Sequence, residues 1–285
     1  MKNILKCIKT FVLGTFVSIA FLSCGDEHDF NKYDSPVDAN KAKLKFVHTG
    51  IGTGNTNFAV NFFANNTKIS AVGVVSGLPL GITYPNTYPT PINYSLIPAG
   101  LQDLKFSIPA RAAVVFPTPQ PAFPETPLFT APINTEAGKN YTTFLVGVAP
   151  DFSLHTVNDD FSNIGSNEPT AFVRFINLVN NTPAAGYELV ISRTTPAPVT
   201  VLKTFSAIGF KGGSALFEPL QTIPATETTP YTIQFRVTGT TTIIPTSPAN
   251  LNFTPRPGRV YTFFSRGVVG ATAAFAPTLS FYINR

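Results

Sequence analysis

The chain contains the same sequence pattern twice, and this internal repeat constrains its fold more than any other feature. GKNYTTFLVGV, which begins at Gly138, recurs as GRVYTFFSRGV from Gly258. Three matched blocks follow one another in the same order, which indicates a duplicated structural unit. The matched blocks are residues 44–48 and 173–177, 97–99 and 223–225, and 138–148 and 258–268.

Each unit is predicted to be all-β. Residues 231–237 (YTIQFRV) alternate between apolar and polar side chains, which is typical of a strand with one face in the core and the other in water. Residues 58–63 precede Asn65-Asn66, a pair that tolerates positive φ, and the chain returns through Lys68-Ile69, which predicts a hairpin. We therefore expect two tandem β-sandwich domains of the immunoglobulin-like or transthyretin-like type.

The first residues predict export. Three lysines precede an apolar run at residues 11–22, and the small residue Ser23 follows that run. This order is typical of a secretory signal peptide, and the run is too short to span a bilayer. Cys24 at the expected cleavage point resembles the lipidated cysteine of a bacterial lipobox. The sequence therefore predicts a lipoprotein that is anchored to a membrane through Cys24.

The rest of the chain divides by composition. Asp26-Glu27 resembles the acidic export tag of surface lipoproteins, which predicts an outer-membrane location that faces the cell exterior. A proline-rich segment at residues 116–132 is expected to be an extended loop. The predicted parts are a signal peptide at residues 1–23, a lipidated flexible tether at 24–42, a first sandwich at 43–150, a linker at 151–168 and a second sandwich at 169–285.

Charge and cysteine content exclude several classes of function. Removal of residues 1–23 takes away three of the 20 basic residues and none of the 15 acidic ones, so the formal charge falls from +5 to +2. Because nucleic-acid binding needs a concentrated basic surface, no nucleic-acid partner is expected. Cys7 leaves with the signal peptide and Cys24 is the expected lipid acceptor, so no thiol remains for a disulfide, a zinc site or a nucleophile.

No motif in the chain predicts catalysis or a cofactor. His48 ends a strand-like segment, and its counterpart in the second repeat is Asn177, which favours a side-chain hydrogen bond to the following loop over proton transfer. Residues 50–55 contain three glycines but precede a strand rather than a helix, which favours a strand-connecting loop over a phosphate site. We expect that the protein is not an enzyme, that it has no catalytic residues and that it needs no cofactor.

One cluster of oxygen ligands suggests calcium. Asp159, Asp160, Asn163 and Glu168 lie in the expected linker, and calcium takes six to eight oxygen ligands from such side chains. The spacing does not match the twelve-residue calcium loop. A solvated linker is the alternative.

Aromatic residues suggest two further features. Tyr141 and Tyr261 each stand three residues after a glycine at the start of the last matched strand, which resembles a tyrosine corner whose hydroxyl bonds to nearby backbone. Tyr84, Tyr88, Phe123 and Phe129 lie in or near proline-rich segments and form a candidate contact surface for a partner. The alternative is that these segments fold over their own sandwich.

At the repeated blocks the chain resembles a family of bacterial exported proteins, the domain of unknown function 4397 family. The resemblance covers about Lys43 to Arg285, although the second repeat has Thr226 where the family has a turn glycine. It implies an exported tandem β fold, and no site residue follows from it because the family has no established chemistry. The matching features are His48 or Asn177 before a loop, Pro98-Ala99-Gly100, and the strands between Gly138 and Gly147 and between Gly258 and Gly267.

The sequence thus predicts a non-catalytic binding or assembly module at the cell surface, with a protein as its partner. Two alternatives remain open. A glycan-binding accessory lipoprotein is disfavoured by the absence of tryptophan, because sugar platforms favour that ring. A fimbria-like structural subunit would polymerise by strand exchange.

Overall fold

The structure, a computed structural model, describes residues 40–70, 74–75, 78–79, 81–90, 92–111, 113, 121–165, 169–214, 216–223, 227–244, 251–271 and 273–285. These residues belong to one compact unit. The predicted signal peptide, the lipidation site Cys24 and residues 24–39 of the predicted tether lie outside the described residues. Within the described residues, no helix is long and apolar enough to cross a membrane.

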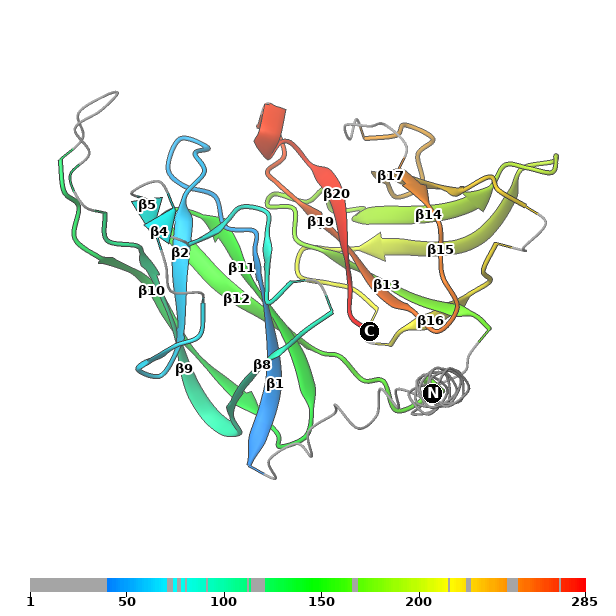
Figure 1. Ribbon diagram of the computed structural model, residues 1–285. Helices are drawn as coiled ribbons and strands as arrows, with labels where there is room; N and C mark the ends of the chain where they lie inside the picture. Colours follow the sequence, from blue (N-terminus) through cyan, green and yellow to red (C-terminus); the bar gives the residue numbers. More distant parts are fainter. Residues whose placement is uncertain are drawn as a thin grey trace, which may run out of the picture. The chain divides into compact units, whose positions relative to one another are not determined.

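The first repeat forms two facing sheets (Figure 1). One sheet has the order β12-β11-β1, with β7 and β8 both pairing with β1, and the other has the order β10-β9-β2-β3, with β6 also on β2. The strands are β1 (Lys41–His48), β2 (Ala59–Ala64), β3 (Thr67–Lys68), β6 (Ile82–Thr83), β7 (Thr87–Tyr88), β8 (Ser95–Pro98), β9 (Gly100–Ile108), β10 (Thr126–Thr135), β11 (Asn140–Val148) and β12 (Asp151–Asn158), with a separate pair β4 (Val74–Val75) and β5 (Leu78–Pro79).

The second repeat also forms two sheets, in the orders β16-β13-β19-β20 and β15-β14-β17-β18. A short 3-10 turn, η2 (Ala273–Phe275), precedes the last strand. The strands are β13 (Ala171–Asn177), β14 (Tyr187–Arg193), β15 (Thr200–Ile208), β16 (Glu218–Leu220), β17 (Tyr231–Val237), β18 (Leu251–Phe253), β19 (Val260–Arg266) and β20 (Thr278–Ile283).

The two repeats share one topology, which confirms the predicted tandem β-sandwich. Strand β1 runs parallel to β11 with Leu44 opposite Tyr141, and β13 runs parallel to β19 with Val173 opposite Tyr261. Both pairs therefore have the same register at the matched sequence blocks. The hairpin is also confirmed, because β2 and β3 pair on either side of Asn65, whose φ is +51°.

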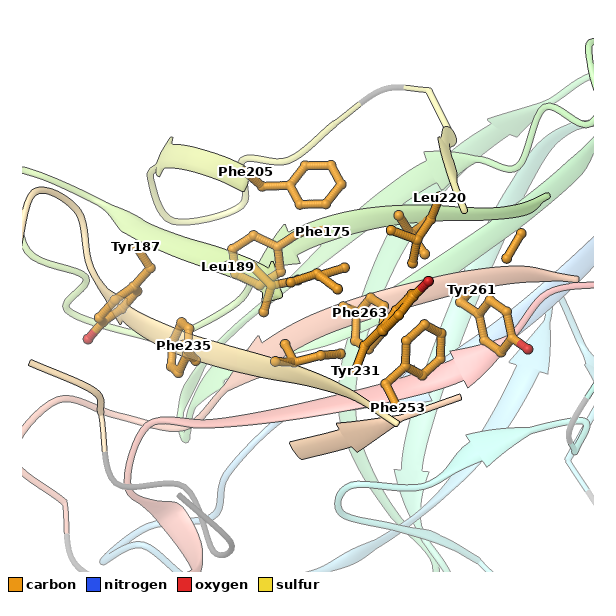
Figure 2. Close-up of a cluster of buried hydrophobic side chains, with 14 of the residues drawn as sticks. Phe175, Tyr187, Leu189, Phe205, Leu220, Tyr231, Phe235, Phe253, Tyr261 and Phe263 are labelled. Atoms are coloured by element: carbon orange, nitrogen blue, oxygen red, sulfur yellow. The ribbon is translucent and has the colours of Figure 1, made fainter. Parts of the chain in front are cut away.

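Phenylalanine and tyrosine rings fill the two cores. In the second sandwich, Phe175, Phe235 and Phe263 are almost completely buried between the sheets (Figure 2). In the first sandwich, Phe46, Phe62 and Phe106 stack on one another with ring centroids 5.0–5.3 Å apart. Burial of each ring contributes roughly 1.5–3 kcal/mol, so the cores can hold the fold without disulfides.

Glycine is required at the second glycine position of the repeated motif for steric reasons. Gly147 and Gly267 have φ values of 113° and 111°, a region that residues with a Cβ atom rarely adopt. A Cβ atom on Gly147 would lie 2.1 Å from the carbonyl oxygen of Asp151, and one on Gly267 would lie 2.4 Å from that of Ala276. The backbone crosses closely at these points, so both repeats need glycine there.

The predicted tyrosine corners are confirmed. The Tyr141 hydroxyl accepts a hydrogen bond from the backbone N–H of Glu136 at 3.1 Å, and the Tyr261 hydroxyl accepts one from the backbone N–H of Arg256 at 3.2 Å. Each bond ties the loop before the strand to the strand itself.

Replacement of either corner tyrosine by phenylalanine is expected to lower the free energy of unfolding by about 1 kcal/mol, because one backbone N–H loses its acceptor. Urea unfolding of Tyr141→Phe and Tyr261→Phe measures this loss, and the equivalent geometry predicts similar values for both. A loss in one variant only would contradict a shared structural role.

Strand β12 lies inside the predicted linker at 151–168, so that prediction is wrong for Asp151–Asn158. Phe152 and Leu154 pack against the core of the first sandwich, while Val157 packs against a second apolar cluster. The many polar residues of the segment suggested a solvated linker. The alternation of Phe152 and Leu154 with polar residues is nevertheless sufficient for an edge strand.

The predicted proline-rich loop at residues 116–132 also ends earlier than expected, because strand β10 begins at Thr126. Residues 114–120 lie outside the described part. Pro127 and Pro132 are compatible with β10 because it pairs only with β9, and an edge strand can lack N–H donors on its outer side.

Candidate functional site

The four predicted calcium ligands do not form one site in the described residues. The carboxylate of Asp159 is buried and bound by other side chains, whereas Asp160 accepts a hydrogen bond from the backbone N–H of Ser162. Asn163 is exposed, and Glu168 lies outside the described residues. No group of three histidine, cysteine, aspartate or glutamate side chains gathers in the part of the chain that the structure describes.

The predicted contact surface is also divided. Tyr84 is buried, and its hydroxyl accepts a hydrogen bond from Arg266 of the second sandwich at 2.7 Å. Tyr88 and Phe129 pack against the first core, so Phe123, 40% exposed, is the member of the four that lies most in solvent. The prediction of one shared surface is wrong for Tyr84, because its ring is held between the two sandwiches.

His48 has the structural role that its repeat counterpart predicts. Its Nε2 lies 3.2 Å from the carbonyl oxygen of Phe58, beyond the following loop. Burial lowers the pKa of His48 to about 3, so the ring is neutral at physiological pH. Asn177 instead accepts hydrogen bonds from the backbone N–H of Val179 and from the Ser265 hydroxyl.

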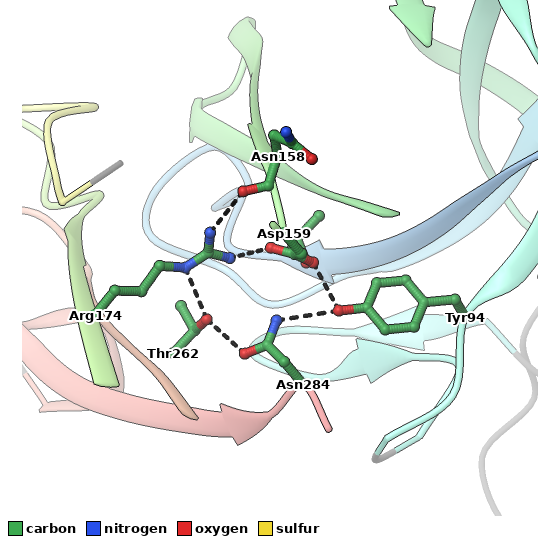
Figure 3. A network of polar contacts seen from close by, with 7 residues as sticks. Tyr94, Asn158, Asp159, Arg174, Thr262 and Asn284 are labelled. Atoms are coloured by element: carbon green, nitrogen blue, oxygen red, sulfur yellow. Dashed lines mark hydrogen bonds and ion pairs between the residues drawn. The ribbon is translucent and has the colours of Figure 1, made fainter. Parts of the chain in front are cut away.

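The centre of the molecule is a buried charged network that joins the two sandwiches (Figure 3). Arg174 on β13 forms an ion pair with Asp159, which follows β12, and both side chains are almost completely buried. The Arg174 guanidinium also donates to the carbonyl oxygen of Asn158 at 3.0 Å and to the Thr262 hydroxyl at 2.9 Å. The second sandwich is therefore bound to the end of strand β12.

The other side of Asp159 is bound from the first sandwich. The hydroxyls of Thr142 and Tyr94 donate to this carboxylate at 2.6 and 2.7 Å. Tyr94 in turn accepts from the Asn284 amide at 3.1 Å, and Asn284 accepts from the Thr262 hydroxyl at 2.7 Å. The network closes into a ring of hydrogen bonds, which satisfies its buried polar groups.

The network follows the internal repeat. Lys45 and Arg174 occupy the same position in β1 and β13, and each lies over an aromatic ring. The Lys45 Nζ lies 4.8 Å from the ring centroid of Tyr94, which precedes β8. The Arg174 Cζ lies 4.3 Å from the ring centroid of Phe217, which precedes β16. Lys45 also donates to the carbonyl oxygen of Asn93 at 2.7 Å. Burial lowers the pKa of Lys45 to about 8, although Asp159 opposes this shift.

Apolar side chains surround these charges. The cluster consists of Val47, Phe144 and Val146 from the first sandwich with Ile176, Leu178, Phe264 and Tyr282 from the second. The sheet β12-β11-β1 thus packs against the sheet β13-β19-β20. Sequence patterns do not predict this contact, because Lys45 and Arg174 stand on the faces that period-2 alternation assigns to water. The repeated cation at one position was the available signal.

A pocket of about 330 Å³ lies beside this interface. It is lined by His155, Val157 and Asn158 of β12, by Ile176 of β13 and by the loop at residues 211–214. Burial together with Lys211 and Arg174 lowers the pKa of His155 to about 4. Lys211 is the charged side chain among the residues that line the pocket.

In the described part of the chain, the site residues do not form an arrangement that is typical of catalysis. Comparison with known proteins found distant structural similarity. No family model matches the chain, so its resemblance to the domain of unknown function 4397 family stays a prediction. No curated protein matches it either. A crystal structure of a protein from Bacteroides uniformis, with a proposed role in cell adhesion, shares 13% identity and a TM-score of 0.24 over 85% of this chain and 96% of its own.

Proposed function

We propose that this chain is a non-catalytic binding or assembly module that a lipid on Cys24 holds at the outer membrane, facing the cell exterior. The predicted signal peptide and the acidic Asp26-Glu27 pair support this location. The module is a pair of sandwiches whose shared interface makes them one unit, and its partner is a protein.

The engagement of the titratable groups supports a non-catalytic role. In the described residues, the Asp159 carboxylate is paired with Arg174, and His48 is buried with a pKa of about 3. Glu188 is paired with Arg236 on the second sandwich. These groups stabilise the fold, whereas general acid–base catalysis needs a group with a pKa near the working pH. Lys45 has such a pKa, about 8, but its ammonium group is buried against the Tyr94 ring and donates to the carbonyl oxygen of Asn93.

Strand β15 is the observation that supports a protein partner. It lies at the end of its sheet and pairs with β14 on one side, and it is the longest edge strand without proline in the described sheets. Val201 on this strand is 58% exposed, and Val199 directly before it is 65% exposed. An edge of this kind can accept a strand from another chain through backbone hydrogen bonds, with apolar side chains adding contact area.

Crosslinking on intact cells that express the full lipidated chain, followed by mass spectrometry, tests this function. We expect conjugates with a partner protein, and the crosslinked residues to lie on or next to β15. The charge of Lys203 on β15 is paired with Glu218, whereas an added unpaired charge on an edge strand disfavours strand addition, so Val201→Lys should reduce the conjugates strongly. Leu101→Lys is the matched control, because Leu101 is 73% exposed on the first sandwich, and it should leave the conjugates unchanged.

Other outcomes would contradict the proposal. Equal conjugate yields in Val201→Lys and wild type would exclude β15 as the contact. A ladder of self-conjugates would indicate a polymerising subunit instead, and the absence of any conjugate would direct attention to soluble glycans.

A further inference from the structure

The pocket beside the interface has walls of well-defined geometry. The loop at residues 209–214 is fixed by backbone hydrogen bonds from Lys211 to the carbonyl oxygen of Asn177 and from Ser214 to that of Phe175, at 2.8 and 3.1 Å. A Cβ atom on Gly213 would lie 2.6 Å from the carbonyl oxygen of Phe175, so the loop lies directly against β13. The opposite wall is strand β12, which pairs with β11 along its full length.

Lys211 supplies the net charge beside this pocket, because the charge of the nearby Arg174 is paired with Asp159. Lys211 lines the pocket, and its Nζ lies 3.4 Å from the carbonyl oxygen of Leu154, a long contact that leaves the ammonium group able to bind another acceptor. The groups that face His155 are Lys211 from the loop and Arg174 from β13. Asp159, the carboxylate close to them, is already bound to Arg174, Thr142 and Tyr94.

We propose that this pocket binds a small oxyanion, such as a carboxylate, sulfate or phosphate group, which pairs with Lys211 and lies against the ring of His155. Val157 and Ile176 also line the pocket and offer apolar contacts to the molecule that bears the anion. The ammonium charge of Lys211 favours an anionic group over a neutral one, because the charge of Arg174 is already paired with Asp159. This site is independent of the β15 edge, because its ligand is a small molecule and its recognition depends on charge.

Proton NMR of the histidine ring signals tests the proposal directly. The chain has only three histidines, and His155→Gln identifies the signal of His155. The full chain in a neutral detergent is titrated with pH in the presence of glucuronate, sulfate or phosphate, with chloride at equal ionic strength as the reference. An anion beside the ring favours its protonated form, so the pKa of His155 should rise from about 4 to about 5 or higher.

Two controls separate binding from general salt effects. Burial and the carbonyl oxygen of Phe58 set the pKa of His48, and neither Lys211 nor Arg174 contributes to it. The signal of His48 should therefore not respond to the oxyanions. Lys211→Met keeps a side chain of similar length at the same positive φ of 58°, and it should weaken oxyanion binding about tenfold, as expected for one charge-assisted hydrogen bond.

The outcomes are distinct. A response to glucuronate alone would support an acidic sugar as ligand, and a response to sulfate and phosphate as well would support a general oxyanion site. A rise of the His155 pKa that chloride reproduces, that persists undiminished in Lys211→Met, or that is absent with all three oxyanions would overturn the proposal.

Discussion

Replacement of Asp159 by alanine is expected to lower the free energy of unfolding by about 3–5 kcal/mol, the range for breaking a buried ion pair by removing one partner. Arg174 would remain almost completely buried without its carboxylate, and Lys45 would lose a nearby opposite charge. The hydroxyls of Thr142 and Tyr94 would also lose their common acceptor. This loss is a large fraction of the stability of an ordinary domain.

Urea unfolding of the full chain in a neutral detergent measures this effect. Lys203→Met is the matched control, because it breaks the Lys203–Glu218 pair, whose side chains are partly exposed, and should cost at most about 1 kcal/mol. The double variant Asp159→Leu with Arg174→Met should recover much of the loss, because it removes both charges together. A cost below about 1 kcal/mol for Asp159→Ala would show that the network does not hold the sandwiches together.

Acidification is expected to destabilise the fold between pH 6.5 and about 3, and His48 should be a main cause. Its pKa is about 3 in the folded chain and near 6.5 in the unfolded one, so the unfolded state binds the extra proton throughout this window. Stability is therefore lost as the pH falls through it, by up to about 1.4 kcal/mol per pH unit for one such group. His155, with a pKa of about 4 and a less buried ring, should add a smaller loss.

The variant His48→Asn isolates this contribution, since asparagine occupies the same position in the second repeat as Asn177 and does not titrate. It should be less stable than the wild type at neutral pH. Asn177 accepts a hydrogen bond from Ser265 on the paired strand, whereas the residue opposite position 48 is Leu145, which has no side-chain donor. The unfolding free energy of the variant should then fall less steeply with decreasing pH. Parallel pH profiles for the two proteins, measured by urea unfolding, would mean that His48 becomes protonated in the folded state.

The repeat, the strands and several local features could be predicted because they depend on short-range chemistry. Alternation at residues 231–237 corresponds to strand β17, and Asn65 adopts the positive φ that its hairpin needs. Tyr141 and Tyr261 stand beside the backbone that they bind, within five residues along the chain. Spacing alone was therefore sufficient to predict these contacts.

The same reasoning failed where a residue's partner is distant in the chain. Asp159 was interpreted as a calcium ligand because it stands among polar residues, yet its partners include Tyr94, 65 residues away. Tyr84 was assigned to an open surface, whereas its partner Arg266 is 182 residues away. Local composition contains no information on such pairings.

The duplication, the sandwich class and the glycines and tyrosines that each repeat needs can be deduced from the amino-acid sequence, since they follow from alternation, backbone sterics and neighbouring hydrogen bonds. The contact of the two sandwiches through Arg174 and Asp159, and the pocket between β12 and the loop at residues 209–214, arise from the packing of whole sheets. Alternation assigns a side chain to one face of a sheet. What covers that face depends on how the sheets pack, and here a second sheet covers it instead of water.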